Sequence, residues 1–317
     1  MDIGYTLSSE EHGPRDLVRN ATLAEESGFD FLSISDHFHP WVDRQGHSPF
    51  VWAVIGGVAE ATEEIPLITG VTAPIIRIHP AIVAHAAATA GAMMPGRFSL
   101  GLGTGENLNE HVVARRWPSA DERLEMLEEA VQVIRTLWRG GTQTHRGRFF
   151  HVEDARIYDL PDRLPPILIA AKGDAATKLA GQKGDGLVAV APEEDIISTF
   201  DEAGGRGKPR YGQFHLCWAE DEAEARRTAR EWWPNTAVPG ELSVELPMPR
   251  HFEQASENVT EDQVAESVPC GPDAQPIIEQ VGKFRDAGYD HVFLHQVGPD
   301  QEGFLKFARE ELLPKLS

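Results

Sequence analysis

The sequence predicts an α/β protein: a (β/α)8 TIM barrel with insertions, formed as one domain over residues 1–317. Short apolar runs alternate along the chain with longer amphipathic ones, as repeated βα units require. The length is usual for one such barrel with insertions. A doubly wound open sheet is the structural alternative. A dinucleotide fold of that kind would require Gly-x-Gly-x-x-Gly after the first apolar run, and the sequence has none there.

Eight apolar runs have the length of strands, and eight parallel strands can close into a barrel without edge strands. They are Ile3–Leu7, Phe31–Ser35, Leu67–Ala73, Phe98–Leu102, Ile167–Ala171, Gly186–Ala191, Gln213–Trp218 and His291–Gln296. Helical patterns lie between them, at Arg15–Ser27, Val51–Glu63, Ile82–Met93, Asp121–Trp138, Ala175–Gln182, Asp221–Trp232 and Ala274–Ala287. Two longer irregular stretches, residues 140–166 and 233–260, break the alternation. Long inserts on a barrel usually serve as lids or oligomer contacts.

The composition argues against several classes of function. A formal net charge of −21 disfavours binding to nucleic acid or to an anionic membrane surface. No apolar run approaches the ~20 residues that span a bilayer, and the first residues lack a secretion signal. Cys217 and Cys270 have neither a disulfide-framework nor a metal-site spacing, so we expect no metal and a cytoplasmic location. The acidic, Lys-poor composition suits a salt-rich cytoplasm or merely reflects a GC-rich genome.

In a TIM barrel the chemistry sits where the strands end, so the residues after each strand are the candidates. The second strand ends in Asp36 and His37, with Trp41 following. Histidine exchanges a proton near neutral pH, and a Trp ring can wall off a flat ring system and exclude water. In the alternative interpretation, Asp36 caps a turn and His37 is incidental.

Glycines mark the ends of the third and fourth strands. Gly70 permits close approach of the backbone to a ligand, or simply makes a turn. The fourth strand runs into Gly101-Leu102-Gly103-Thr104-Gly105-Glu106, followed by Asn109, which adds polar side chains to a close backbone approach. The fifth strand ends in Ala171-Lys172-Gly173 before a helix, where free N–H groups and the helix dipole favour an anion. In the alternative interpretation, Lys172 is a solvated surface residue that binds no anion.

Together these motifs resemble the luciferase-like flavin and deazaflavin barrels, and most closely the F420-dependent glucose-6-phosphate dehydrogenase family. The similarity extends over nearly the whole chain. The residues that carry it are Ser35–Trp41, Thr72-Ala73-Pro74 with Arg77 and His79-Pro80-Ala81, Gly101–Glu106 with Asn109-Glu110, Ala170-Ala171, Gly288–Phe293 and Phe304–Phe307.

The resemblance implies roles for these residues and a homodimer. Coenzyme F420 would be held by Asp36, Gly70, Val71, Thr72, Thr104, Gly105, Asn109, Ala171, Lys172 and Gly173, the last three at its phosphate. The Gly70–Val71 peptide would be a cis bond beneath the deazaflavin ring. His37, Trp41 and Glu106 would surround the substrate carbon that exchanges a hydride with C5 of that ring. The family has Gly in place of Lys172, so a contact from this side chain to the coenzyme is an extrapolation.

The chain departs from that family where a sugar phosphate would bind. The family places a Lys shortly after the sixth strand, whereas this stretch reads Ala191-Pro192-Glu193-Glu194-Asp195. Residues 264–270 also contain no Lys or Arg. Because carboxylates repel a phosphate dianion, we expect the substrate to be a non-phosphorylated alcohol or sugar.

The working hypothesis is alcohol oxidation, with His37 removing the hydroxyl proton while Trp41 and Glu106 position the substrate. Three alternatives stay open: F420H2-dependent reduction of a carbonyl or enone, an FMN-dependent luciferase-like monooxygenase, and a non-catalytic cofactor carrier.

Overall fold

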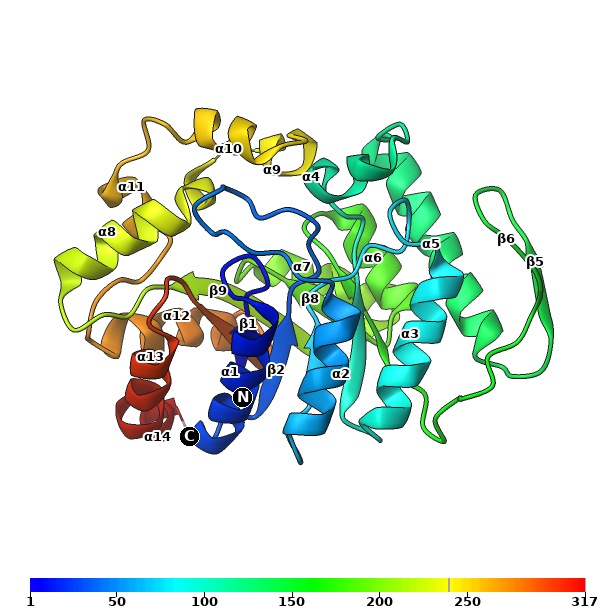
Figure 1. Ribbon diagram of the computed structural model, residues 1–317, viewed down its shortest axis with the longest axis horizontal. Coiled ribbons are helices and arrows are strands. Elements are labelled where there is room, and N and C mark those ends of the chain that lie inside the picture. The colour runs from blue at the N-terminus through cyan, green and yellow to red at the C-terminus, as the bar shows by residue number, and fades with distance from the viewer. Residues whose placement is uncertain (239, 317) are drawn as a thin grey trace.

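The computed structural model describes residues 1–238 and 240–316, and its strands form a closed parallel barrel (Figure 1). Neighbouring strands follow the order β1-β10-β9-β8-β7-β4-β3-β2. Their bounds are β1 Asp2–Leu7, β2 Phe31–Ile34, β3 Leu67–Thr69, β4 Phe98–Leu102, β7 Ile167–Ala170, β8 Gly186–Ala189, β9 Arg210–Leu216 and β10 His291–Gln296. Each strand overlaps one predicted apolar run, and the eight close into a parallel barrel, so the predicted fold class is confirmed.

Helices surround the barrel (Figure 1), and most of those given next lie where helical patterns were predicted, whereas residues 194–200 and 301–307 were not predicted to be helical. They are α1 Pro14–Ser27, α2 Val51–Ala61, α3 Pro80–Met93, α5 Ala120–Leu137, α6 Asp174–Lys183, α7 Glu194–Phe200, α8 Glu222–Trp232, α12 Gln275–Asp286 and α13 Gln301–Phe307. Proline at the first position begins α1 and α3, since its missing N–H has no partner there in any case. Gly28 ends α1 in the left-handed conformation at φ 88°, which glycine adopts without a steric cost.

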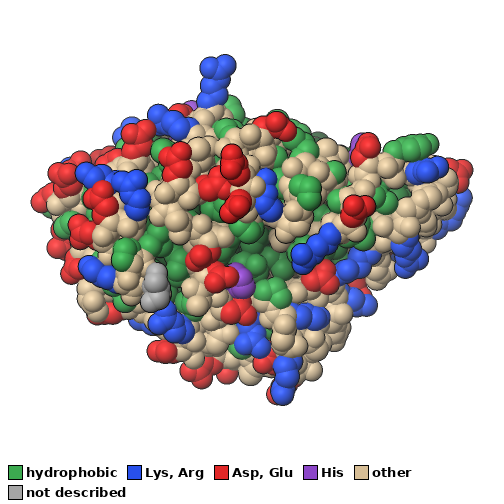
Figure 2. Space-filling view, turned by 90° about the horizontal axis from the view of Figure 1, so that it is seen from below, with side chains coloured by type: hydrophobic (Ala, Val, Ile, Leu, Met, Phe, Trp, Pro, Cys, Tyr) green, Lys and Arg blue, Asp and Glu red, His purple; other side chains and the backbone are tan. Residues whose placement is uncertain are grey.

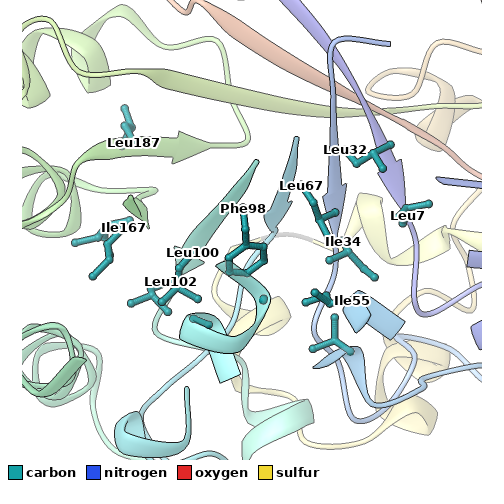
Figure 3. Close-up of a cluster of buried hydrophobic side chains, with 14 of the residues drawn as sticks. Leu7, Leu32, Ile34, Ile55, Leu67, Phe98, Leu100, Leu102, Ile167 and Leu187 are labelled. Atoms are coloured by element: carbon teal, nitrogen blue, oxygen red, sulfur yellow. The ribbon is translucent and has the colours of Figure 1, made fainter. Parts of the chain in front are cut away.

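Alternate residues of the strands form two separate apolar layers, because successive side chains point to opposite faces. Figure 3 shows part of the outer layer, where Ile34 of β2 lies next to Ile55 of α2 and Leu67 and Leu100 follow on the neighbouring strands. The inner layer contains Phe31, Ile68, Leu168, Val188 and Phe293. These inward side chains fill the barrel itself, so any ligand must bind at an end of the barrel.

The two predicted insertions carry more regular structure than their sequences suggest. Residues 140–166 contain a hairpin of β5 Gln143–Arg146 and β6 His151–Ala155, which projects from one side of the barrel (Figure 1). Residues 233–260 contain the short helices η3 Pro234–Ala237, α9 Leu242–Glu245 and α10 Pro249–Ala255. Residue 239 of this insertion lies outside the described residues, as does residue 317. The prediction that these two stretches are irregular was therefore wrong in part. Prolines such as Pro234 and Pro249 interrupt a long helical pattern, but they also begin short helices.

The remaining elements near the barrel mouth are α4 Asn107–Glu110, η1 His111–Val113 and α11 Glu261–Ala265. The Asn107 side chain donates to the Glu245 carbonyl at 2.9 Å, which ties α4 to α9. On the face shown in Figure 2, acidic and basic side chains are interspersed around apolar surface. Within the described residues, no helix is long and apolar enough to cross a bilayer, and no group of His, Cys, Asp and Glu could hold a metal ion.

Candidate active site

A cavity of ≈ 410 Å³ lies at the carboxyl ends of the barrel strands. Of the residues predicted from the sequence, it brings together Asp36, His37, Trp41, Gly70, Val71, Thr104, Gly105, Glu106, Asn109, Ala171, Lys172 and Gly173. Thr72 was also predicted to hold the coenzyme, but it is fully buried beside Leu102 and does not line the cavity. Its hydroxyl instead donates to Asp36 Oδ2 at 2.8 Å, so Thr72 supports a wall of the cavity.

His37 forms a pair with Glu10, a residue that the sequence analysis missed. His37 Nε2 lies 3.3 Å from Glu10 Oε1, and both side chains are almost fully buried. His37 Nδ1 faces the His39 carbonyl oxygen at 3.1 Å and must carry a proton, since a carbonyl can only accept. The proton between Nε2 and the carboxylate is therefore the one that this pair can give up or take.

The surroundings of Glu10 favour its charged form. Burial raises the pKa of its carboxyl, but His37 and the hydroxyl of Ser35 oppose burial, and the net pKa is lowered. Ser35 Oγ donates to Glu10 Oε2 at 2.5 Å and also accepts the Ser9 N–H at 2.9 Å. A signal for Glu10 was present in the sequence, because the polar run that contains it follows directly after the first strand.

Asp36 belongs to a buried triad, with Arg77 and Glu110, that holds the loops after β2 and β3 against α4. Arg77 Nη2 donates to Asp36 Oδ1 at 2.8 Å, and Arg77 Nε lies 3.5 Å from Glu110 Oε1. The Arg77 backbone N–H donates to Glu110 Oε2 at 2.7 Å. Burial raises the pKa of Glu110 to about 7 although Arg77 opposes the shift. With both its oxygens engaged by Thr72 and Arg77, Asp36 shapes the cavity wall.

Asn109 links two of the predicted motifs. Its side-chain oxygen accepts the N–H groups of Phe38 and His39 at 2.8 and 3.2 Å, and its amide donates to Glu106 Oε2 at 3.2 Å. Asn109 is buried, so this arrangement fixes the loop that follows His37 relative to Glu106. The ring of Trp41 packs 5.1 Å from that of His37 and 5.2 Å from that of Phe252 in α10.

Glycine and apolar residues from the ends of β3 and β4 line another part of the cavity. The peptide between Gly70 and Val71 is cis, as the resemblance implied. A Cβ on Gly103 would lie 2.7 Å from Val71 Cγ2, and Gly105 adopts φ 68°, so both positions require glycine. At one end of this part of the cavity Lys172 is exposed and Gly173 precedes α6, whose first N–H groups are free to meet an anion.

The opposite wall holds Trp233, together with four residues that were absent from the sequence prediction: Gln213, His215, Val244 and His295. The rings of His215 and His295 lie 4.5 Å apart, and that of Trp233 lies 4.6 Å from each. Burial lowers the pKa of His295 to about 4 and that of His215 well below its ordinary value. Both imidazoles are therefore neutral, so this side of the cavity carries little charge.

Comparison with known proteins agrees with this architecture. Residues 1–291 match the family described as luciferase-like monooxygenase. The chain is 35% identical over 328 residues to the F420-dependent glucose-6-phosphate dehydrogenase of Microbacterium testaceum, covering 100% of this chain and 97% of that one. It is 36% identical over 327 residues to the enzyme of that name from Kribbella flavida, covering 99% and 98%.

Solved structures point the same way. An F420-dependent secondary alcohol dehydrogenase in complex with an F420-acetone adduct has a TM-score of 0.91, 32% identity and 98% coverage of both chains. The F420-dependent tetrahydromethanopterin reductase of Methanopyrus kandleri shares the fold, with a TM-score of 0.81, 20% identity and coverage of 100% and 99%. The chain therefore belongs to the luciferase-like monooxygenase family, together with the F420-dependent glucose-6-phosphate dehydrogenases.

Proposed function

We propose that this protein exchanges a hydride between coenzyme F420 and a small non-phosphorylated alcohol or its carbonyl form. That the chain is an F420-dependent oxidoreductase rests on relatives of over 30% identity along its whole length. The same relatives favour F420 over FMN. The identity of the substrate, the roles of single residues and the favoured direction are our proposal.

The cavity fits a deazaflavin. Its lining includes Val71, Gly103 and Ala170, and Gly103 lets the end of β4 approach Val71 closely, because a Cβ there would lie 2.7 Å from Val71 Cγ2. Lys172 and the N-terminus of α6 would meet the coenzyme's phosphate. Bound there, the coenzyme supplies a ring carbon that accepts or returns a hydride.

The His37–Glu10 pair is the single observation that carries the proposed chemistry. An alcohol must lose its hydroxyl proton as its carbon loses a hydride, and this pair offers a place for that proton inside the cavity. The ionised Glu10 carboxylate stabilises positive charge on His37 once the proton has arrived. Glu106, which Asn109 orients, and Trp41 would position the substrate.

The charges of the cavity favour an uncharged substrate. Of the described residues that line it, Lys172 is the one Lys or Arg, whereas four are carboxylates: Glu10, Asp36, Glu106 and Glu110. The acidic residues of the β8–α7 connection open α7 and are exposed. A phosphate dianion would meet net repulsion here, and a small neutral alcohol would not. The F420-acetone adduct named for the related alcohol dehydrogenase has a substrate portion of this kind.

A panel of substrates tests the proposal. Purified protein is loaded with coenzyme F420 and mixed with 2-propanol, glucose or glucose 6-phosphate while deazaflavin absorbance is followed. We expect reduction by a non-phosphorylated compound and none by glucose 6-phosphate. Efficient turnover of glucose 6-phosphate would contradict the proposal.

Variants test the assignment of His37. We expect His37→Gln to lower kcat by about 100-fold while the Kd for coenzyme F420 stays the same. His85→Gln, which changes an exposed histidine of α3, is the matched control and keeps both values. A His37→Gln variant that loses coenzyme binding but turns over normally at saturation would assign His37 to the coenzyme.

Two further expectations belong to this proposal. The free thiols of Cys217 and Cys270 support a cytoplasmic location, where thiols stay reduced. A homodimer is proposed from the resemblance alone, and light scattering of the purified protein tests it.

A further inference from the structure

Another cavity, of ≈ 320 Å³, opens on the outside of the barrel beside α1 and α13. Its lining includes Glu11, His12, Asp16 and Asp300. Glu11 follows directly after Glu10 of the active site, but it faces this other cavity. Its side chain is fully buried, so the carboxylate lies in the wall between the outer cavity and the barrel.

The Glu11–His295 pair lies between the two cavities. Glu11 Oε2 is 3.2 Å from His295 Nε2, and the His295 ring lines the active-site cavity. Glu11 Oε1 accepts the Gly298 N–H at 2.7 Å, which fixes the carboxylate in place. The Ser8 hydroxyl donates to Glu10 Oε2 at 3.2 Å and also interacts with Glu11, so a polar group lies between the two carboxylates.

We propose that Glu11, with Ser8 and His12, forms a proton path that connects the His37–Glu10 pair to solvent at the outer cavity. The inference rests on the proposed function. Oxidation of an alcohol breaks a C–H and an O–H bond: the hydride goes to the coenzyme, and the hydroxyl proton goes to His37–Glu10. That proton then moves through the Ser8 hydroxyl, which takes it from Glu10 and passes its own proton to Glu11, and it leaves at His12. In carbonyl reduction the proton moves along the same path in the opposite direction, from solvent to the His37–Glu10 pair.

Two observations support this path. His37 and Glu10 are almost completely buried, so the pair needs a route by which to return to its starting protonation state. His12 Nε2 is buried without a hydrogen-bond partner among the described residues, so it is free to take a proton from Glu11, and the half-buried His12 ring lines the outer cavity. Burial raises the pKa of Glu11 to about 7, although His12 and the Gly298 N–H oppose the shift. His12 is in turn faced by Asp16 and His47 from α1 and the loop after β2.

The test compares Glu11→Gln with Glu302→Gln. Gln keeps a hydrogen-bonding group at position 11 but cannot carry the proton. We expect Glu11→Gln to lower kcat at least about tenfold without changing the KM for alcohol, with partial rescue by added formate or imidazole. Glu302 lines the same outer cavity as an exposed partner of Arg19, and Glu302→Gln keeps the wild-type kcat. Wild-type kcat and pH dependence in Glu11→Gln would overturn the path.

A second readout needs no coenzyme. Infrared titration of the unloaded protein should show two protonated carboxyls that titrate near pH 7, those of Glu11 and Glu110, and the Glu11 signal should be missing in Glu11→Gln while the Glu110 signal remains. An unchanged carboxyl signal in that variant overturns the path even if turnover falls. If the wild-type protein oxidises no alcohol, the proposed function fails, and this titration alone then decides whether Glu11 carries a proton at neutral pH.

Discussion

At the residue scale, the neutral pair of Glu11 and His295 makes a prediction about stability and pH. Glu11 has its pKa raised from 4.5 to about 7, and His295 has its pKa lowered from 6.5 to about 4, both mainly by burial. Between pH 4.5 and 6.5 the folded pair holds one proton on Glu11, and the unfolded chain holds one on His295. The numbers of bound protons match, so in the wild-type protein this pair contributes almost no pH dependence.

Single substitutions in this pair should make the free energy of unfolding depend on pH, with opposite slopes in the two variants. In His295→Gln, the remaining Glu11 binds more protons when folded, so stability falls as the pH rises from 4.5 to about 7. In Glu11→Gln, the remaining His295 binds fewer protons when folded, so stability falls as the pH drops from 6.5 to about 4. Urea unfolding at several pH values measures both slopes. Slopes of the same sign would show that the pair is not neutral.

The sequence predicts which loops supply the site but not which side chains meet in it. His37, Trp41 and Glu106 were found because each follows a strand end. Glu10 also follows a strand, yet its role emerges only from its 3.3 Å contact with His37. His215 and His295 lie within strands, and which strand residues reach the cavity depends on the stagger of the barrel. That stagger is a property of the closed sheet, which no single segment reveals.

At the element scale, the Arg77 triad joins the loops after β2 and β3 to α4. Replacing Arg77 with Leu leaves Asp36 and Glu110 buried without their cation, which should cost about 3–5 kcal/mol of unfolding free energy. Arg77→Lys keeps the positive charge between the two carboxylates. It should cost less, because an ammonium group can still pair with Asp36 and loses only the hydrogen bond from Arg77 Nε to Glu110. Urea denaturation of both variants measures the difference. An equal cost for the two would mean that the triad stabilises through packing and not through charge.

The elements themselves were largely predictable. Strand and helix positions followed from apolar runs and caps, as Pro14 and Gly28 at the two ends of α1 illustrate. The helices of residues 233–260 were not predicted, because segments of four to seven residues show too few turns for a helical period to appear. They matter for the site, since Val244 of α9 lines the cavity and Phe252 of α10 supports Trp41.

At the scale of the whole molecule, the net charge of −21 should make stability depend on salt. Acidic groups repel one another in the compact state, and salt screens this repulsion over about 10 Å at 0.1 M and about 3 Å at 1 M. We expect Tm to rise between these concentrations of NaCl, and to rise similarly in NaBr because the effect is one of screening. Calorimetry measures it. A Tm that is constant or falls would show that the charges are already compensated in the fold.

The central claim is that an alcohol carbon gives its hydride to coenzyme F420 in the cavity beside His37. Deuterium transfer tests it most directly. The protein loaded with coenzyme F420 is supplied with 2-propanol deuterated at C2, and the mass of the reduced coenzyme is measured together with the rate. The account predicts one deuterium in the coenzyme and a slower reaction than with unlabelled alcohol. Reduced coenzyme without deuterium, or reduction only by glucose 6-phosphate, would contradict it.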